Sequence, residues 1–335
     1  MHPELIKLEK TFKPSILTRI DDPLLDQYHI ELWMKRDDLL HPVISGNKWR
    51  KLKYSLDHAL SSGADTIVSM GGAYSNHLHA LAYTGKLVGL KTLGFIRGEQ
   101  PETLTPTLCD MQNWGMELKF VSRSDYRLLR QYKGCHDLPG LKPGQYWLPE
   151  GGAQTLALKG VAELVNEIDV LYDILCVPCG TGATLAGIIN AASESVSVMG
   201  FAALKNAGFL LTDVEALLPR PCTKEQARNN LSFISPYPNP LPEGESVRCS
   251  SDFMHSPDWQ INLDYHFGGF ATTTPELMAF IADFECKTGI PLEPVYTGKM
   301  MYALYDLITK HTFKPGQRII AVHTGGLQGK RGFSA

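Results

Sequence analysis

The sequence predicts an α/β protein with two lobes, in which parallel sheets carry helices on both faces. Short apolar runs such as Thr66–Met70 alternate with helical patterns such as Ser75–Val88 over most of the chain, an order typical of strand–helix–strand units. Glycine-bearing segments follow several of these runs, at the edge where parallel sheets bind ligands. The 335 residues are too many for one simple core and enough for two lobes.

The individual elements follow from hydrophobic spacing. A first helix is expected from about Asn47, because Leu52, Leu56, Ala59 and Leu60 recur on one face. The expected strands are then Thr66–Met70, Thr92–Ile96, Leu118–Val121, Tyr146–Leu148, Ile174–Val177, Val196–Leu204 and Arg318–Val322. The expected helices are Ser75–Val88, Thr103–Trp114, Lys159–Ile168, Ala183–Ala192, Pro275–Lys287 and Gly298–Lys310.

Two segments do not fit this alternation. Residues 122–145 are polar and contain several glycines and prolines, and residues 219–258 hold several prolines and few periodic positions. A structureless loop of the second length is uncommon inside a compact domain. We therefore interpret 219–258 as a surface excursion with short helices and as a candidate cover of the active site.

Composition excludes several classes of protein. Hydrophobic residues make up 44% of the chain and charged residues 20%, with a formal net charge of −3, so neither nucleic acid nor an anionic membrane is favoured as a partner. No apolar run approaches the roughly 20 residues of a membrane helix. The first residues lack a signal-peptide core, and the seven cysteines have no regular spacing. These features predict a cytoplasmic location.

Cys176 and Cys179 form a CxxC sequence whose context is apolar. The run Ile174–Val177 surrounds Cys176, which favours a buried strand end over a redox helix. No second cysteine pair or histidine cluster completes a zinc site. We therefore expect no metal.

Lys48 lies in a turn-forming Ser-Gly-Asn sequence directly before the first patterned helix. The positive partial charge at a helix start favours the neutral, nucleophilic form of a lysine. A neutral lysine is what a Schiff base with an aldehyde cofactor requires. For this cluster alone, a solvated Lys/Arg helix face is the simpler interpretation, and only the other segments change that balance.

The segment Gly71–His77 follows a strand and opens a helix. Its glycines let the backbone pass close to a ligand, while Ser75 and Asn76 occupy the N-cap and first turn, where free N–H groups favour an anion. Plain helix capping explains the same residues equally well.

A second strand–loop–helix unit contains Cys179, Gly180, Thr181, Gly182, Ala183 and Thr184. The backbone N–H groups of such a loop can hold a phosphate, with threonine hydroxyls adding bonds. The loop is not a Walker sequence, and it lacks the full dinucleotide-binding spacing. A plain tight turn remains the alternative.

Three more segments complete the set. Glu150–Ala153 and His323–Gly326 are expected to end strands, and Pro294–Lys299 is expected to join a strand end to a helix. Alone, each has an ordinary structural explanation, such as a helix N-cap at Thr297. Their convergence on the carboxyl ends of strands predicts one shared binding site.

Taken together, these segments resemble the fold-type II, tryptophan synthase β-like pyridoxal-phosphate enzymes, and within them the family of D-cysteine desulfhydrase and 1-aminocyclopropane-1-carboxylate deaminase. The ordered motifs are SGNKWRK, GGAYSN, PEGGA, CGTGAT, EPVYTGK and HTGG. The resemblance implies a small lobe over residues 51–152 and a large cofactor-binding lobe over residues 1–50 and 153–335. It also implies pyridoxal 5'-phosphate as cofactor and a homodimer.

The resemblance implies a role for each site residue. Lys48 would be the Schiff-base lysine, and Asn76 would bond the pyridoxal hydroxyl. Residues 179–184 would bind the phosphate, Thr297 would meet the pyridine nitrogen, and Thr324 would lie beside the cofactor. The residues implied in substrate binding are Ser75, Asn76, His77 and Tyr296, and the candidate bases are Lys48, Ser75 and Tyr296.

The implied reaction is α,β-elimination on a small D-amino acid. D-cysteine is the best single candidate, and its products would be pyruvate, sulfide and ammonia. The deaminases typically carry Glu at the position of Thr297 and Leu at that of Thr324, so both threonines resemble the desulfhydrase pattern. His77 departs from the Gln usual in the deaminases. The alternatives are ring-opening deamination of 1-aminocyclopropane-1-carboxylate, another pyridoxal lyase or racemase, and a non-catalytic binding protein.

Overall fold

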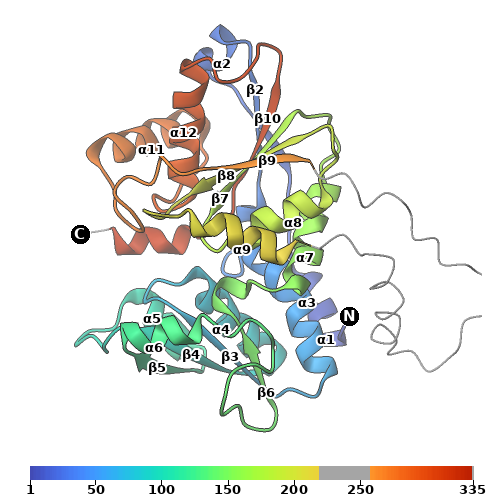
Figure 1. The fold of residues 1–335 in the computed structure, drawn as a ribbon, viewed down its shortest axis with the longest axis vertical. Helices are drawn as coiled ribbons and strands as arrows, with labels where there is room; N and C mark the ends of the chain where they lie inside the picture. Colours follow the sequence, from blue (N-terminus) through green and yellow to red (C-terminus); the bar gives the residue numbers. More distant parts are fainter. Residues whose placement is uncertain (219–256, 334–335) are drawn as a thin grey trace, which may run out of the picture.

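The computed structural model describes residues 1–218 and 257–333 and contains two separate sheets (Figure 1). The smaller sheet has the order β5-β4-β3-β6 and is parallel throughout. Its strands are β3 (Thr66–Gly71), β4 (Lys91–Arg97), β5 (Met116–Val121) and β6 (Gln145–Leu148). The helices that connect them are α4 (Asn76–Val88), α5 (Pro106–Asn113) and α6 (Arg123–Leu129).

The larger sheet has the order β1-β2-β10-β7-β8-β9, in which only β1 runs antiparallel to its neighbour. Its strands are β1 (Leu17–Ile20), β2 (Glu31–Lys35), β7 (Ile174–Cys179), β8 (Ser197–Ala202), β9 (Asp258–Asn262) and β10 (Arg318–Val322). The helices of this part are α2 (Pro23–Gln27), α7 (Thr155–Asn166), α8 (Ala183–Ala191), α9 (Phe209–Leu217), α11 (Pro275–Thr288) and α12 (Thr297–Thr309).

Both faces of the larger sheet are covered, as the apolar runs predicted. Ile319 and Ala321 of β10 pack in one core with α11 and α12, whereas Ile320 and Val322 pack in a second core with α7, α8 and α9. Every residue of β7 is buried, including Cys176 and Cys179. Burial raises the pKa of both thiols, so the CxxC sequence is a buried strand end, as expected.

Helix α3 (Asn47–Ser61) joins the two sheets. Its apolar side chains Leu52, Leu56 and Ala59 lie in a core with strands β3 and β6 of the smaller sheet. Its opposite side carries Arg50. The Arg50 guanidinium donates to the carboxylates of Asp37, which follows β2, and of Glu167, at the end of α7. The helix that positions Lys48 is therefore fixed to both parts of the molecule.

The division of the chain into lobes is clear in the sheets but less sharp in the sequence. All four strands of the smaller sheet fall within the proposed range 51–152. Helix α3 runs unbroken across the proposed boundary at residue 50, and Leu5 and Leu8 of α1 (Pro3–Glu9) pack in the smaller sheet's core. The exact domain boundaries stay a prediction.

Several elements were not expected from the sequence, and one expectation was wrong. Helix α6 occupies the start of the polar segment 122–145, with Ser122 capping it through the N–H of Asp125. The residues before α12 form a turn instead of a strand end.

Within the described residues no helix is long and apolar enough to cross a membrane. The expected excursion lies outside the described residues except for its last two positions.

Candidate active site

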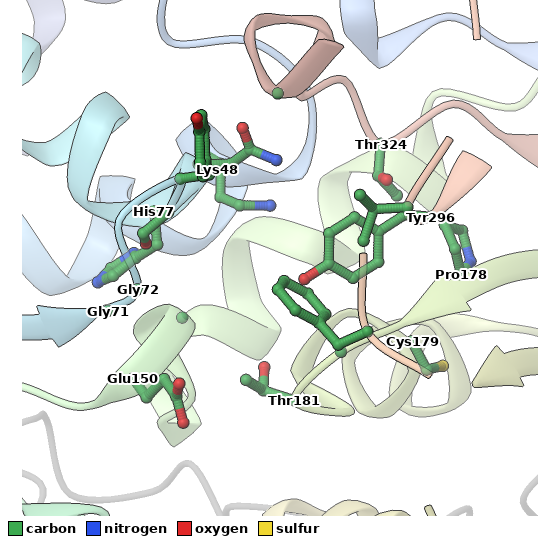
Figure 2. Close-up of a pocket in the computed structure, with 18 of the residues that line it drawn as sticks. Lys48, Gly71, Gly72, His77, Glu150, Pro178, Cys179, Thr181, Tyr296 and Thr324 are labelled. Carbon is green, nitrogen blue, oxygen red and sulfur yellow. The ribbon is translucent and has the colours of Figure 1, made fainter. Parts of the chain in front are cut away.

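A cavity of about 410 Å³ lies between the two sheets, at the carboxyl ends of β3, β4 and β7 (Figure 2). It brings together segments that are far apart in the sequence. The predicted site residues that line it are Lys48, Ser75, Asn76, His77, Cys179, Gly180, Thr181, Gly182, Ala183, Thr184, Tyr296 and Thr324. Thr297, which follows Tyr296 in the chain, is the exception. Its side chain is fully buried and does not line the cavity.

Gly46 places Lys48 at the start of α3. Its φ of 65° and ψ of −150° are accessible to glycine, and a Cβ there would lie 1.8 Å from the Thr324 carbonyl oxygen. The next residue, Asn47, donates from its backbone N–H to that oxygen at 3.3 Å and from Nδ2 to Thr184 Oγ1 at 2.8 Å. The start of α3 is thus fixed against the loop at Thr324 and the first turn of α8.

Two lysines of α3 point their amines at this cavity. Burial lowers the pKa of Lys48 to about 8, partly opposed by the carboxylate of Glu293, and the Lys48 amine donates to Asn47 Oδ1. The predicted direction is confirmed, and its main cause is burial. Lys51, which the sequence analysis missed, is 4% exposed and has no hydrogen bond or ion pair among the described residues. Its spacing of three residues from Lys48 was the available signal.

Ser75 and Asn76 stand where β3 turns into α4. Ser75 is the N-cap and its Oγ accepts from the N–H of Leu78 at 3.2 Å, so the capping interpretation holds alongside any role in binding. Gly71 is required here, because a Cβ on it would lie 2.4 Å from Ser75 Oγ. Asn76 Oδ1 accepts from Gln328, which belongs to the C-terminal turn η4 (Leu327–Gly332).

His77 is buried in its neutral form. Ser69 Oγ donates to the Leu148 carbonyl at 2.7 Å and must therefore accept from His77 Nε2, 2.9 Å away. Nδ1 is then unprotonated, and it is buried without a partner in the described residues. Burial, with Lys51 and Lys48 nearby, keeps the pKa of His77 well below its usual value.

The loop after β7 leaves its backbone donors available. Gly182, at φ 74°, is the N-cap of α8, and no side chain caps the first turn. The N–H groups of Gly180 to Gly182 make no backbone hydrogen bond within the described residues. A Cβ on Gly182 would lie 2.7 Å from Val214 Cγ2 of α9, and one on Gly180 would lie 3.1 Å from the Tyr296 ring. This is the geometry of an anion site at a helix start.

Glu293 organises the start of α12. Its carboxylate accepts the backbone N–H groups of Val295 at 2.8 Å, Tyr296 at 2.7 Å and Thr297 at 2.6 Å, and burial raises its pKa. Because Tyr296 is the N-cap residue and Glu293 binds the free N–H groups, the alternative of Thr297 as the cap is wrong. Thr297 Oγ1 is instead buried without a hydrogen-bond partner among the described residues.

Tyr296 faces the cavity together with an aromatic residue that the sequence analysis missed. Phe270 lines the cavity, is 53% exposed and meets the Tyr296 ring edge-to-face, with centroids 5.9 Å apart. Burial raises the pKa of Tyr296, so its hydroxyl stays protonated at neutral pH. Within the described residues no group of three or more His, Cys, Asp or Glu side chains is arranged to hold a metal ion.

These features fit an aldehyde cofactor that carries a phosphate and a ring nitrogen. The Lys48 amine suits the aldehyde and the donors of residues 180–184 suit the phosphate. The Thr297 hydroxyl has no partner among the described residues but does not line the cavity, so its contact with the ring nitrogen stays a prediction. A model of the family described as pyridoxal-phosphate dependent enzyme matches residues 17–325.

Known proteins are similar over nearly the whole chain. A Pyrococcus horikoshii protein, provisionally named 1-aminocyclopropane-1-carboxylate deaminase, is 30% identical and covers 98% of this chain and 96% of its own length. The mitochondrial bifunctional D-cysteine desulfhydrase/1-aminocyclopropane-1-carboxylate deaminase of Arabidopsis thaliana is 29% identical over 89% of this chain and 73% of its own.

The likeness extends to a solved structure. The crystal structure of a 1-aminocyclopropane-1-carboxylate deaminase homologue superposes with a TM-score of 0.70 at 27% identity, covering 98% of this chain and 97% of the other. The family match, the relatives and the site agree with the resemblance read from the motifs. The chain therefore belongs to the pyridoxal-phosphate dependent enzymes.

Proposed function

We propose that this protein is a lyase that removes the β-substituent of a small D-amino acid, with D-cysteine as the best single substrate. The products are pyruvate, sulfide and ammonia. Support comes from the name of the Arabidopsis relative, which pairs D-cysteine desulfhydrase with the deaminase, and from the neutral hydroxyl of Thr297. That hydroxyl, buried and without a partner in the described residues, is the observation that carries the choice of substrate.

Four parts of the site would hold the cofactor. Lys48 would bind its aldehyde, Asn76 its ring hydroxyl, residues 179–184 its phosphate and Thr297 its ring nitrogen, with Thr324 alongside. Lys51 lies near Cys179, where burial and the neighbouring Lys48 hold its pKa well below the usual value, so its amine adds a polar group beside the phosphate loop. Bound pyridoxal phosphate supplies an electron sink at the substrate's α-carbon.

The chain's own residues would position the substrate and move its proton. N–H groups at the start of α4, with Ser75, suit the α-carboxylate, and His77 and Tyr296 complete the surroundings. Of the three candidate bases, Lys48 fits best, because its pKa near 8 leaves a useful neutral fraction at pH 7. The raised pKa of Tyr296 makes its hydroxyl a proton donor and not a base.

Thr297 favours elimination of a thiol over opening of a carbon ring. A neutral hydroxyl at Thr297 would not hold a proton on the ring nitrogen and would leave the cofactor a modest electron sink. A stable thiolate leaves readily under those conditions, whereas breaking a carbon–carbon bond demands more. A glutamate at position 297 would also lie beside the buried Glu293, whose carboxylate already accepts the Thr297 N–H at 2.6 Å.

Deamination of 1-aminocyclopropane-1-carboxylate is the second candidate. It is favoured by the provisional name of the Pyrococcus relative, which is similar over 96% of that protein's length. Thr297 and Thr324, which resemble the desulfhydrase pattern, weigh against it.

Two measurements test the proposal. Borohydride reduction followed by peptide mapping should place the cofactor on Lys48, and Lys48→Gln should abolish the label while Lys91→Gln, an exposed control, keeps it. Keto-acid release should be clear with D-cysteine and small with L-cysteine and the cyclopropane acid. A label on another lysine contradicts the cofactor assignment. A kcat/KM for the cyclopropane acid at or above that for D-cysteine contradicts the choice of substrate.

A further inference from the structure

The cavity also carries three charged side chains and one tyrosine that the proposed reaction does not use. Arg97 at the end of β4, Tyr126 and Arg130 from α6 and its C-cap, and Glu150 after β6 all line the cavity. We call these four residues the outer cluster. They end or follow strands β4, β5 and β6 at the carboxyl edge of the smaller sheet.

The only carboxylate of the outer cluster is already satisfied. Glu150 accepts from the Tyr126 hydroxyl at 2.6 Å through Oε1 and pairs with Arg130 Nε at 2.9 Å through Oε2. Arg130 also lies over the Phe209 ring of α9, 5.7 Å from its centroid, which directs it toward the larger part of the molecule. Glu150 and Arg130 therefore compensate one another.

Arg97 is the cation that remains. Its guanidinium lies 5.8 Å from the centre of the buried Tyr126 ring, and it forms no ion pair with a carboxylate in the described part of the chain. Two arginines and one glutamate give the outer cluster a net charge of +1. A planar guanidinium held over an aromatic ring at the edge of a cavity is suited to a carboxylate or sulfonate.

We propose that Arg97 forms a subsite for an anionic group on the far end of the substrate. The substrates would then include, beside D-cysteine, D-cysteine derivatives whose sulfur bears an acidic substituent. This inference rests on the proposed elimination. The base takes the α-proton, the Cβ–S bond breaks, and sulfur leaves with the electron pair as an acidic thiolate. The enamine that remains takes up water and gives pyruvate and ammonia.

The cofactor's phosphate is the competing anion. Gly151, next to Glu150, approaches Thr181 of the phosphate loop so closely that a Cβ on it would lie 2.9 Å from Thr181 Cγ2. If Arg97 served the phosphate, its loss would release cofactor. If it served the substrate, cofactor content would be unchanged and only acidic substrates would suffer.

The test compares S-carboxymethyl-D-cysteine with its uncharged amide, S-carbamoylmethyl-D-cysteine, which has nearly the same size. Arg97→Gln should lower kcat/KM for the acid about five- to tenfold, because the contact is charge-assisted but partly exposed to water. The values for the amide and for D-cysteine should stay the same, as should cofactor content by absorbance. Arg127→Gln, which removes an exposed arginine of α6 outside the cavity, should change none of these quantities.

A binding measurement separates this inference from the proposed reaction. Protein reduced with borohydride cannot turn over, and calorimetric titration should show tighter binding of the acid than of the amide, with the difference lost in Arg97→Gln. Equal binding of acid and amide by the unmodified protein, or loss of cofactor in Arg97→Gln, overturns the subsite. Failure of the unmodified protein to turn over D-cysteine, with the binding preference intact, overturns the reaction and keeps the anion subsite.

Discussion

Replacing Gly46 by alanine should disrupt the start of α3 without touching any chemical group. Two effects add. The left-handed backbone of Gly46, at φ 65° and ψ −150°, costs a residue with a side chain about 1–3 kcal/mol. The new Cβ would also stand 1.8 Å from the Thr324 carbonyl oxygen, a backbone atom that cannot rotate away, and such overpacking costs about 1–3 kcal/mol or more.

Gly63 offers a control with a similar positive φ and no collision. It has a φ of 78°, and nothing lies within 4 Å of the position of its Cβ. Gly63→Ala therefore carries left-handed strain alone, about 1–2 kcal/mol. The difference between the two variants reports the collision with Thr324 together with the strain of the Gly46 ψ of −150°.

Thermal unfolding and cofactor absorbance are the assays. At roughly 2 °C per kcal/mol for a chain of this size, Gly46→Ala should lower Tm by about 5–10 °C and Gly63→Ala by about 2–4 °C. Only Gly46→Ala should also lose cofactor, since the bond from Asn47 to Thr184 depends on the helix start. Equal Tm values for the two variants, with full cofactor content in both, would refute the reasoning.

Three further predictions concern the site and its supports. Arg50→Gln leaves Asp37, which is fully buried, without its bidentate partner and should lower the free energy of unfolding by about 3–5 kcal/mol; a urea titration that shows less than 1 kcal/mol contradicts this. Gly182→Val places a branched side chain at φ 74° against Val214. It should reduce cofactor retention while the circular dichroism spectrum still shows a folded protein. Full cofactor retention would mean that the phosphate binds elsewhere. With the pKa of Lys48 lowered to about 8, its neutral fraction rises from about 9% at pH 7 to about 91% at pH 9, so covalent uptake of cofactor by the apo-protein should become about tenfold faster. A flat pH profile of that uptake would argue against Lys48 as the attacking amine.

The fold was predicted mainly from local patterns of apolar residues in the sequence. The strand Arg318–Val322 was predicted with the bounds that the structure has, because both faces of that strand are apolar. Helix α6 was missed because only Tyr126 is buried on it, so a seven-residue helix shows no periodicity. Its N-cap, Ser122, was the one local signal present.

Tertiary contacts limited how much of the site could be predicted from the sequence. The motifs named the loops that surround the cavity, but a motif does not say which other side chains the fold brings to it. Phe270 and Arg97 line the cavity from segments that have no recognisable chemistry in the sequence. Thr297 was read as a possible cap, and only the folded turn shows that Glu293 binds those N–H groups and leaves the threonine hydroxyl free.

Helix α3 is attached to its two neighbours by contacts of different kinds. Toward the larger sheet it presents Arg50, whose ion pairs with Asp37 and Glu167 depend on direction. Toward the smaller sheet it presents a mainly apolar surface with one hydrogen bond, between His58 and Tyr146 of β6, and apolar contacts have no preferred direction. A sliding motion between the halves of the molecule is therefore easiest on the apolar side. In such a motion Ser75 would travel with the smaller sheet, while Lys48 would keep its place beside the phosphate loop.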